Sequence, residues 1–413
     1  MFSREERERL VAFWNAPGRY RIEPADPPGR LWRVRQTPDG SRWLLAVQRA
    51  ALGRGKRPPN RDAGLRDARP EWDAWIAARW ERDRWEAARL AAVLNGLAPP
   101  AGTEPPQAGP IPDDLAEAAG APPALTAAVA PRAYRVTLDD GSTVRYTDQV
   151  AVRPRFAHFR HPQGVSEAGT PLSHVPAEDV AAVFRQAGLS PSAVRAFLAV
   201  SRLEGGFDSV NTFDTGGVSV GFLQFAALED GRGSLAAVLA RMRADSPRDY
   251  ERDFRAYGID VDASGALTVV DPSTGTELRG AEAVRGCIDD KRLVAVFQQA
   301  GRRPAFRLAQ ARTAAAMFWP AASEVRATVG SRVLTARISE VVRSEAGLAT
   351  LLDRKVNRGS LEPFADVVRR VAEREGLTDL RAATRWEREI VAALRFRADF
   401  LEDPTLTQPR AAR

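Results

Sequence analysis

Apolar residues recur at intervals of three and four along the second half of the chain, a spacing that predicts amphipathic helices. Such helices are expected over residues 177–187, 191–204, 281–300, 303–318, 362–375 and 384–401. Alternating segments at 257–261 and 266–271, separated by a glycine turn, predict a β-hairpin inserted among these helices. Residues 176–402 are therefore expected to form the largest domain of the chain, with a mainly helical structure.

The first part of the chain has a different pattern. Alternating segments at 31–35 and 43–47 flank a Pro-Asp-Gly-Ser turn and predict a β-hairpin, and helical spacing predicts a helix from Pro70 to Asn95. Seven of the nine tryptophans lie in this part of the chain. Residues 1–96 are therefore expected to form a compact module, rich in tryptophan and arginine, with the tryptophans in its core.

Two segments separate this module from the helical domain. Proline and alanine dominate residues 97–131, which is the composition of a semi-rigid linker, and one short helix is expected near Leu115. Residues 132–175 begin with a second predicted hairpin and continue as a connecting segment. The predicted fold class is α+β: a small α+β N-terminal module precedes a mainly α C-terminal domain that carries small β-hairpin insertions.

Composition narrows the chemistry that the chain can perform. No stretch approaches the roughly 18 uncharged apolar residues of a transmembrane helix, and the N-terminus lacks an apolar signal segment. We therefore expect no transmembrane segment and no Sec signal peptide, and a chain that is cytoplasmic as made.

A single cysteine, Cys287, excludes an internal disulfide, and the three histidines have no spacing typical of a metal site. Neither a metal nor a cofactor is expected, so catalysis would rest on carboxylates or hydroxyls.

The charge of the chain favours anionic partners. Sixty basic residues against fifty-three acidic ones give a formal net charge of +7, which suits nucleic acid, a cell wall or a membrane surface. Only three of the basic residues are lysines, and codon usage in a GC-rich genome explains such an arginine excess without any selection for phosphate binding. Charge alone therefore gives little support to a nucleic-acid-binding function.

The segment around Glu204 is the most informative for function. Ser190 and Pro191 are typical of a helix start, and Glu204 falls on the inward face at the far end of that helix, before Gly205-Gly206. Burial and the negative helix end both disfavour the ionised carboxylate, so the pKa of Glu204 should be raised. Such a group suits general acid catalysis of glycoside cleavage. The alternative is a helix-end glutamate paired with an arginine.

Asp214 is a candidate second carboxylate. It lies ten residues after Glu204 in a segment rich in glycine and other small residues, which is typical of tight turns. Across a groove from Glu204, it would position a water molecule or stabilise an oxocarbenium-like charge. The alternative is that Asp214 only caps the turn.

The sequence LEGGFDSVNTFDTGGVSVGFLQF resembles the catalytic signature of the lysozyme-like superfamily, in particular soluble lytic transglycosylases and goose-type lysozymes. In those families a helix-ending E-S-x-F is followed by a loop and G-L-M-Q. Glu204 takes the position of the catalytic acid, Phe207 that of the aromatic residue, and 221–224 that of G-L-M-Q. The chain departs from the pattern at Gly205 and Leu223, and its loop is about two residues longer.

Two further segments are similar to related enzymes. FDTGGVSVGFLQF resembles the chitosanase segment G-D-G-R-G-x-T-A-G-I-I-G-F, and Asp214 then matches its catalytic aspartate, although the spacing to the glutamate is shorter here. Residues 352–359 resemble the D-x-A-V-N-x-G helix that buttresses the active-site helix in bacterial muramidases and chitosanases. On this resemblance Asp353 and Asn357 are expected to be structural.

The resemblance implies a metal-independent glycoside hydrolase or lytic transglycosylase that cleaves β-1,4 linkages in peptidoglycan or a related amino-sugar polymer. Glu204 is the expected general acid, and Asp214 is the expected base or charge stabiliser. The expected substrate-binding residues are Phe207, Asn211, Thr215, Ser219 and Gln224. A muramidase would yield a reducing end and a transglycosylase an anhydro-sugar, and the sequence leaves both open.

The missing signal sequence keeps a second hypothesis open. A cell-wall enzyme without one needs delivery by a phage-like or injection route. Otherwise the chain is a catalytically inactive, lysozyme-like scaffold or interaction protein in the cytoplasm, with residues 1–96 binding a protein partner. A nucleic-acid-binding protein is the third hypothesis, supported by charge alone.

Overall fold

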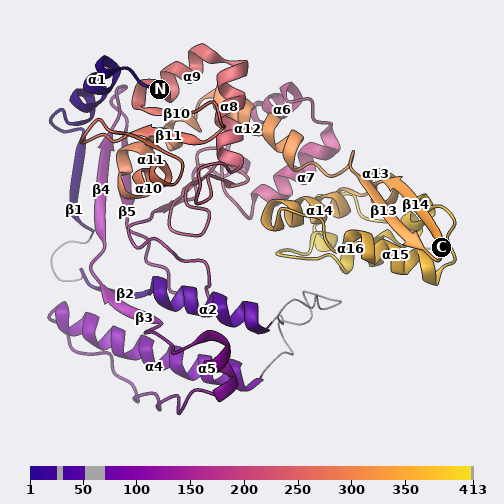
Figure 1. Ribbon diagram of the computed structural model, residues 1–413, viewed down its shortest axis with the longest axis horizontal. Coiled ribbons are helices and arrows are strands. Elements are labelled where there is room, and N and C mark those ends of the chain that lie inside the picture. Colours follow the sequence, from indigo (N-terminus) through magenta and orange to yellow (C-terminus); the bar gives the residue numbers. More distant parts are fainter. Residues whose placement is uncertain (26–30, 52–69, 411–413) are drawn as a thin grey trace.

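The computed structural model describes residues 1–25, 31–51 and 70–410 (Figure 1). The chain has a mixed α+β structure in which helices dominate and the sheets are small. Its largest hydrophobic core unites residues from the helix α1 (Arg4–Trp14), from the hairpin of β4 (Arg132–Thr137) and β5 (Thr143–Thr147), and from most of the chain after residue 165. No helix in the described part of the chain is long and apolar enough to cross a membrane.

The first 24 residues pack against this large core. Helix α1 (Arg4–Trp14) begins at Ser3, whose side chain and that of Glu6 form a reciprocal capping box. Strand β1 (Tyr20–Pro24) pairs with β4 (Arg132–Thr137), which in turn pairs with β5 (Thr143–Thr147). The β4–β5 hairpin predicted from the sequence is thus confirmed. The predicted module of residues 1–96 does not hold together as one unit, because its first 24 residues belong to the large core.

A second, smaller core is built around tryptophans. It brings together β2 (Arg33–Gln36), α2 (Pro38–Ala51), α4 (Pro70–Leu94), α5 (Asp113–Ala119) and β3 (Thr126–Val129). Strand β2 pairs with β3, so residues of the predicted 97–131 linker complete this unit instead of separating two domains. The predicted helix from Pro70 and the short helix near Leu115 are confirmed. Trp43, Trp72, Trp75 and Trp80 are all buried in this core.

The predicted hairpin at 31–35 and 43–47 is wrong in its second half. Residues 43–47 lie in α2, where Trp43, Leu44 and Val47 are buried on one face of the helix. All five residues of 43–47 are apolar, and so short an apolar run fits a helix as well as a strand. Packing against α5 and the other tryptophans decides for the helix.

The rest of the chain forms the large core and a C-terminal lobe. Its first elements, up to the start of the inserted hairpin, are β6 (Ser166–Glu167), η1 (Leu172–His174), α6 (Ala177–Gln186), α7 (Pro191–Ser201), β7 (Val210–Asn211), β8 (Ser219–Val220), β9 (Phe225–Ala226), α8 (Ser234–Asp245), α9 (Pro247–Asp253) and η2 (Arg255–Tyr257). The following elements are β10 (Ile259–Val261), β11 (Leu267–Val270), β12 (Glu277–Arg279), α10 (Ala281–Asp289), α11 (Lys291–Ala300), α12 (Pro304–Met317), β13 (Glu324–Val329) and β14 (Arg332–Arg337). The last are α13 (Ile338–Val341), α14 (Glu345–Arg358), α15 (Phe364–Arg374), η3 (Leu380–Trp386), α16 (Glu387–Ala392) and η4 (Phe400–Glu402).

Most of the predicted helices exist with shorter bounds. The predicted helix over 281–300 is two helices, α10 and α11, because Asp290 ends the first and its side chain accepts a hydrogen bond from the backbone of Arg292 at the start of the second. Of the predicted helix over 384–401, only α16 is α-helical; the 3₁₀ turn η3 precedes it, residues 393–399 are not helical, and η4 follows them. The inserted hairpin is confirmed as β10 and β11.

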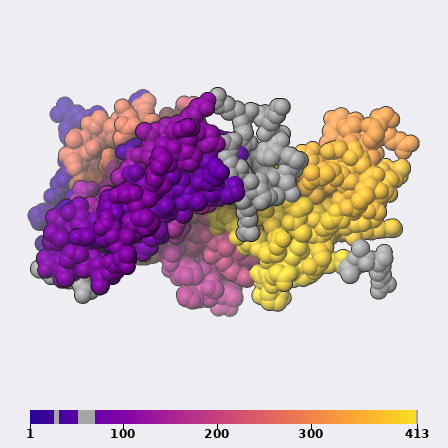
Figure 2. Space-filling view, turned by 90° about the horizontal axis from the view of Figure 1, so that it is seen from below, coloured from indigo at the N-terminus to yellow at the C-terminus, as the bar shows by residue number. Residues whose placement is uncertain are grey.

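The arrangement around α7 positions the candidate site. Helix α7 packs against α6 on one side and against α14 on another. The strands β7, β8 and β9 follow α7 in the chain and form a four-stranded sheet with β6, which precedes α6. In Figure 1, α6 and α7 lie between α8 and α12 on one side and the C-terminal lobe of α14, α15, α16 and the β13–β14 hairpin on the other. In the space-filling view, magenta surface lies between the purple tryptophan-rich unit and the yellow C-terminal lobe (Figure 2).

Candidate active site

Glu204 is presented at the C-terminal end of a buried helix. Ser190 caps α7 by accepting a hydrogen bond from the backbone of Ala193, and Pro191 opens the helix. After the last helical residue the chain turns, and the backbone N–H groups of both Glu204 and Gly205 donate to the carbonyl of Ser201. The local sequence therefore dictates where the glutamate emerges from the helix.

A close backbone contact fixes the turn that holds Glu204. The Gly206 N–H donates to the carbonyl of Ala168 at 2.9 Å. A Cβ atom at Gly206 would collide with the carbonyl group of Thr170. Glycine is needed here because two segments, 168–170 and 204–206, approach each other with no room for a side chain.

The Glu204 side chain is only 9% exposed and forms an ion pair. Its Oε1 accepts hydrogen bonds from Arg397 Nη1 at 2.7 Å and from Asn357 Nδ2 at 3.2 Å. Its other oxygen, Oε2, accepts no hydrogen bond from any described residue. The pairing with an arginine that the sequence left open is therefore present, and it engages one of the two carboxyl oxygens.

Arg397 links Glu204 to a second buried carboxyl. The Arg397 backbone N–H donates to Asp353 Oδ2 at 3.2 Å, and its Nε lies 3.7 Å from Asp353 Oδ1. Asn357 Nδ2 donates to Asp353 Oδ1 at 3.0 Å, and Asn357 Oδ1 accepts from Arg397 Nη1 at 2.9 Å. Asp353 and Asn357 both belong to α14, so this network ties the end of α7 to α14 and to the C-terminal segment.

Burial dominates the electrostatics of Glu204. It raises the pKa of this carboxyl to about 7, and the nearby Asp353 acts in the same direction, whereas Arg397 and Asn357 lower it. Burial also raises the pKa of Asp353. Because both donors point at Oε1, a proton on the neutral form of Glu204 has to reside on Oε2. The site thus holds a carboxyl that can donate a proton from a defined oxygen near neutral pH.

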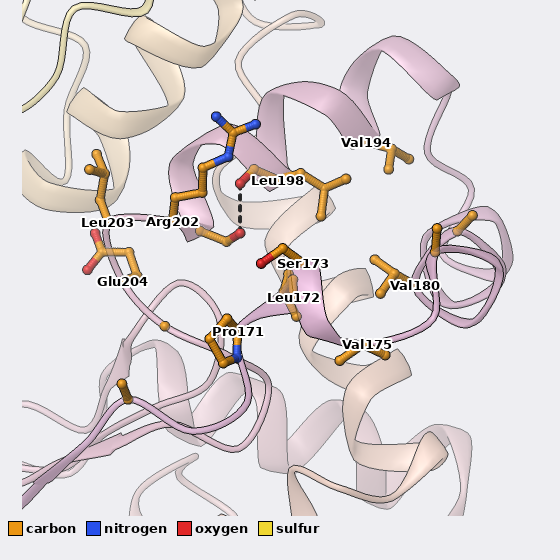
Figure 3. A pocket seen from close by; sticks show the side chains of 15 residues that line it. Pro171, Leu172, Ser173, Val175, Val180, Val194, Leu198, Arg202, Leu203 and Glu204 are labelled. Atoms are coloured by element: carbon orange, nitrogen blue, oxygen red, sulfur yellow. Dashed lines mark hydrogen bonds between the residues drawn. The ribbon is translucent and has the colours of Figure 1, made fainter. Parts of the chain in front are cut away.

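An apolar pocket opens beside Glu204. It has a volume of about 490 Å³ and lies between α6, α7 and the segment 168–175. Figure 3 shows Leu172, Val180 and Leu198 converging on it, with Glu204 at one edge and its carboxyl turned away from these aliphatic side chains. The pocket therefore offers apolar surface next to the acid, and the carboxyl faces the α14 side.

Asp214 caps a turn. Its Oδ2 accepts a hydrogen bond from Asn211 Nδ2 at 2.7 Å, and its Oδ1 accepts from the backbone of Gly216 at 2.9 Å. Its backbone forms an isolated β-bridge with Phe159. Asp214 does not line the pocket beside Glu204. The alternative that the sequence left open for Asp214, a turn cap, is what the geometry shows.

Phe207 does not occupy the position expected for a sugar-stacking residue. Its side chain is 2% exposed, and its ring packs against Phe184 and Phe222 with centroids 6.0 and 5.1 Å away. A ring that is sealed in the core cannot stack on a sugar. The expectation for Phe207 is therefore corrected: it anchors the turn after Glu204 to the core.

The other predicted substrate-binding residues have mixed surroundings. Asn211 holds Asp214, Ser219 is 5% exposed in β8, and Gln224 Nε2 donates to Ser209 Oγ at 2.7 Å. Thr215 is exposed at the tip of the turn. Ser219 and Gln224 are therefore structural in this conformation, and none of the four lines the pocket beside Glu204.

Sequence reasoning missed the closest partner of Glu204. Arg397 lies 193 residues further along the chain, and among the many arginines of this sequence nothing distinguished it. Asn357 and Asp353 were indicated by the resemblance of residues 352–359 to a buttressing helix. The packing of α14 on α7 agrees with that expectation, and Asn357 also contacts the carboxyl itself.

No family model, no curated protein and no solved structure matches this chain. No group of three or more potential metal-ligating side chains comes together in the described ranges of residues. A function has to be inferred from the chemistry of Glu204 and its surroundings.

Proposed function

We propose that the chain is a lysozyme-like glycosidase that cleaves β-1,4 linkages in peptidoglycan or a related amino-sugar polymer, with Glu204 as general acid. The feature that supports it most directly is the Glu204 carboxyl, which is nearly buried and has a pKa of about 7. General acids work best when their pKa lies near the working pH.

The order of elements around Glu204 gives further support. Glu204 lies in the turn three residues after the end of α7, the short strands β7, β8 and β9 follow, and α8 comes next. The helix with the D-x-x-V-N-x-G sequence, α14, packs on α7. An acid at the end of a helix and a buttressing helix are parts that the resemblance to the lysozyme-like superfamily implies. Residues 221–224, which match G-L-M-Q, form a turn here and do not start a helix.

The proposed reaction begins with proton transfer from Glu204 Oε2 to the glycosidic oxygen. The bond from the anomeric carbon to that oxygen then breaks, and the leaving sugar departs as an alcohol. Arg397, bound to Oε1, stabilises the carboxylate that remains. Attack by water gives a reducing end, and attack by the sugar's own hydroxyl gives an anhydro-sugar, so analysis of the released fragments distinguishes hydrolase from transglycosylase.

Release of soluble fragments from purified peptidoglycan tests this proposal. The wild type should release them, and Glu204→Gln should lose at least about 100-fold of the rate, because general acid catalysis contributes that much. Glu178→Gln is the matched control, since Glu178 is an exposed residue of α6 whose side chain forms no hydrogen bond or ion pair with another described residue. A folded wild type that releases nothing, or a Glu204→Gln variant as active as the control, would refute the proposal.

A second candidate is a catalytically inactive scaffold with the same architecture. Two observations favour it: the ion pair between Glu204 and Arg397, and the full use of the Asp214 carboxyl in its own turn. In a scaffold, Glu204 and Arg397 serve only to join α7 to the C-terminal segment. Glu204→Gln would then lower the free energy of unfolding of a chain that releases no sugar fragments in its wild-type form.

A further inference from the structure

A polar pocket lies where the tryptophan-rich unit meets the large core. It has a volume of about 440 Å³. Arg35 of β2 and Val129 of β3 contribute to its lining from the tryptophan-rich unit, and Arg132 of β4 and Asp148 after β5 contribute from the sheet that packs on the large core. It shares no lining residue with the pocket beside Glu204. The two pockets are therefore different sites.

Main-chain hydrogen bonds hold the walls of this pocket together. The backbone N–H of Gln36 in β2 donates to the carbonyl of Ala151, in the segment after β5, at 2.8 Å. In the same segment, the backbone N–H of Gln149 donates to the carbonyl of Gly164 at 2.7 Å. Three stretches of chain that line the pocket are thus joined through their backbones, so the pocket exists without a ligand.

Arg35 brings to the pocket a guanidinium group that forms no ion pair with any described residue. Its Nη1 donates to the carbonyl of Pro162 at 2.9 Å, and its Cζ lies 5.6 Å from the centroid of the Phe159 ring. Its Nε is buried without a hydrogen-bond partner in the described part of the chain. Burial lowers the pKa of Arg35, and Asp148 raises it from beyond ion-pair distance. A guanidinium that has lost hydration without gaining a carboxylate favours the binding of an anion.

Arg132 supplies a second guanidinium. Its Nε donates to Asp148 Oδ2 at 3.3 Å, and its side chain is about half exposed. Asp148 also accepts hydrogen bonds from the Tyr134 hydroxyl at 2.6 Å and from the Arg132 backbone at 3.1 Å. Neighbouring donors thus occupy the Asp148 carboxylate, whereas the Nη groups of Arg132 donate to no residue that the structure describes. These Nη groups are available to a ligand.

A buried lysine adds positive charge behind this wall. Lys291 is 0% exposed, and its Nζ lies 5.1 Å from the centroid of the Tyr134 ring. Burial lowers the pKa of Lys291 to about 8, so the group is mostly protonated at neutral pH. Asp148 acts on Lys291 as it does on Arg35 and Arg132. Three cations therefore share one buried carboxylate, which leaves the pocket with excess positive charge.

Gln163 and Asp289 also line the pocket and limit what it can accept. Gln163 Nε2 donates to Asp289 Oδ1. The Asp289 carboxylate is exposed and forms no ion pair within the described ranges. It repels a second anionic group on a ligand and accepts a hydrogen bond from a hydroxyl. The pocket therefore favours a ligand with one anionic group and a neutral hydrogen-bond donor.

We propose that this pocket binds a small molecule with a single carboxylate or phosphate group, which Arg35 and Arg132 hold while Asp289 accepts a hydrogen bond from a hydroxyl of the same molecule. Guanidinium groups hold such oxyanions through charge-assisted hydrogen bonds. The volume of about 440 Å³ suits a small molecule. The inference does not rest on the proposed glycosidase function.

Calorimetric titration of the full-length chain with related small molecules tests the inference. Glycerol 3-phosphate and glycerate carry one anionic group and hydroxyls, glycerol lacks the anionic group, and tartronate has a second carboxylate in place of the hydroxymethyl group of glycerate. Arg35→Gln and Arg132→Gln each remove one guanidinium from the pocket. The matched control is Arg145→Gln, which removes the same charge from an exposed residue of β5 whose side chain bonds to no described residue.

Glycerol 3-phosphate or glycerate should bind the wild type and the control equally well, and the tighter of the two tells phosphate from carboxylate recognition. Arg35→Gln and Arg132→Gln should each weaken that binding by about 10- to 100-fold, as expected for lost hydrogen bonds to a charged group. Tartronate should bind more weakly than glycerate because its second carboxylate meets Asp289.

Urea denaturation verifies that each variant is folded. If Arg35→Gln does not fold, Arg132→Gln decides alone, because the Arg132 side chain is about half exposed. The inference is overturned if neither anion binds the wild type at millimolar concentration, if glycerol binds as tightly as the anions, if tartronate binds more tightly than glycerate, or if the folded variants bind like the control.

Discussion

At the scale of single residues, Glu204 is subject to two opposing influences. Burial disfavours its charged form, and the ion pair with Arg397 favours it. Burial is the larger effect, so the pKa is raised in spite of the guanidinium 2.7 Å away. The arginine partner therefore does not by itself exclude Glu204 as a proton donor. Arg397 also stabilises the carboxylate of Glu204 that remains after the proton has been donated.

The dependence of stability on pH tests this balance. The pKa of Glu204 in the folded chain, about 7, lies above the 4.5 of an unperturbed glutamate, so the folded chain holds the proton more tightly than the unfolded chain. Glu204 therefore contributes fully to the free energy of unfolding below pH 4.5, and this contribution is lost as the pH rises to about 7. The free energy of unfolding of the wild type relative to Glu204→Gln should fall by up to about 3 kcal/mol across this range.

Urea denaturation of both proteins between pH 4 and about 8 measures this difference. Since the two chains differ at one residue, the other titratable groups contribute nearly equally to the free energy of unfolding of both proteins. Their contributions therefore cancel in the difference. A difference that stays constant, or that rises with pH, would mean that the ion pair dominates and that Glu204 is ionised throughout. That outcome would favour the scaffold over the enzyme.

At the scale of elements, the two ends of α7 have separate roles. Ser190 at its start stabilises the helix through a cap, whereas Gly206, just beyond its end, allows the turn that presents Glu204. The first role concerns stability alone. The second role concerns the position of the acid.

Substitutions at the two ends should therefore differ in their effects. Ser190→Ala should lower the free energy of unfolding by about 1 kcal/mol and leave fragment release per folded molecule unchanged. Gly206→Ala should cost about 1–3 kcal/mol and also reduce fragment release, because its Cβ forces the turn away from the Thr170 carbonyl group. Denaturant titrations and peptidoglycan-release rates check both. Equal losses of activity in the two variants would contradict the separation of roles.

The elements also show where sequence patterns are sufficient. The long helix α4, the helices α6, α7 and α12 and the hairpins β4–β5 and β10–β11 follow from periodicity and turn residues. The helix α2 and the β13–β14 hairpin do not, because short apolar patterns fit more than one element until a neighbour covers one face. The sequence predicted that α7 would run to Glu204 before Gly205-Gly206, but the helix ends at Ser201 and Glu204 lies in the turn that follows.

At the scale of the whole molecule, the first residues of the chain stabilise the unit that carries the site. Trp14 on α1 is 1% exposed in the large core, and its Nε1 donates to the carbonyl of Tyr257 at 3.2 Å. The strand β1 completes a sheet with β4 and β5. Removal of residues 1–96 as a separate module would therefore expose the large core.

A pair of tryptophan substitutions tests this organisation. Trp14→Ala should lower the free energy of unfolding by about 3–5 kcal/mol, as expected for a large buried aromatic side chain. Trp85→Ala is the control, because Trp85 is only half-buried and lies beneath Arg82 and Arg89 on the surface of α4. Denaturant titrations give both values. Similar, small losses in the two variants would indicate that residues 1–24 do not belong to the large core.

The sequence alone determined the local features of this protein: most of the amphipathic helices, and the presence of one largely buried glutamate just after a helix. These local features depend on residues that are close together in the sequence, so the sequence pattern is enough to predict them. Tertiary structure decided that Arg397 and Asn357 bind Glu204, that Phe207 belongs to the core and that Asp214 caps its own turn. The contacts of Glu204 join segments more than a hundred residues apart, and the place of Phe207 is a choice between solvent and core that packing makes. The Asp214 cap is made by neighbouring residues, and only the structure decides between it and the alternative that the sequence left open.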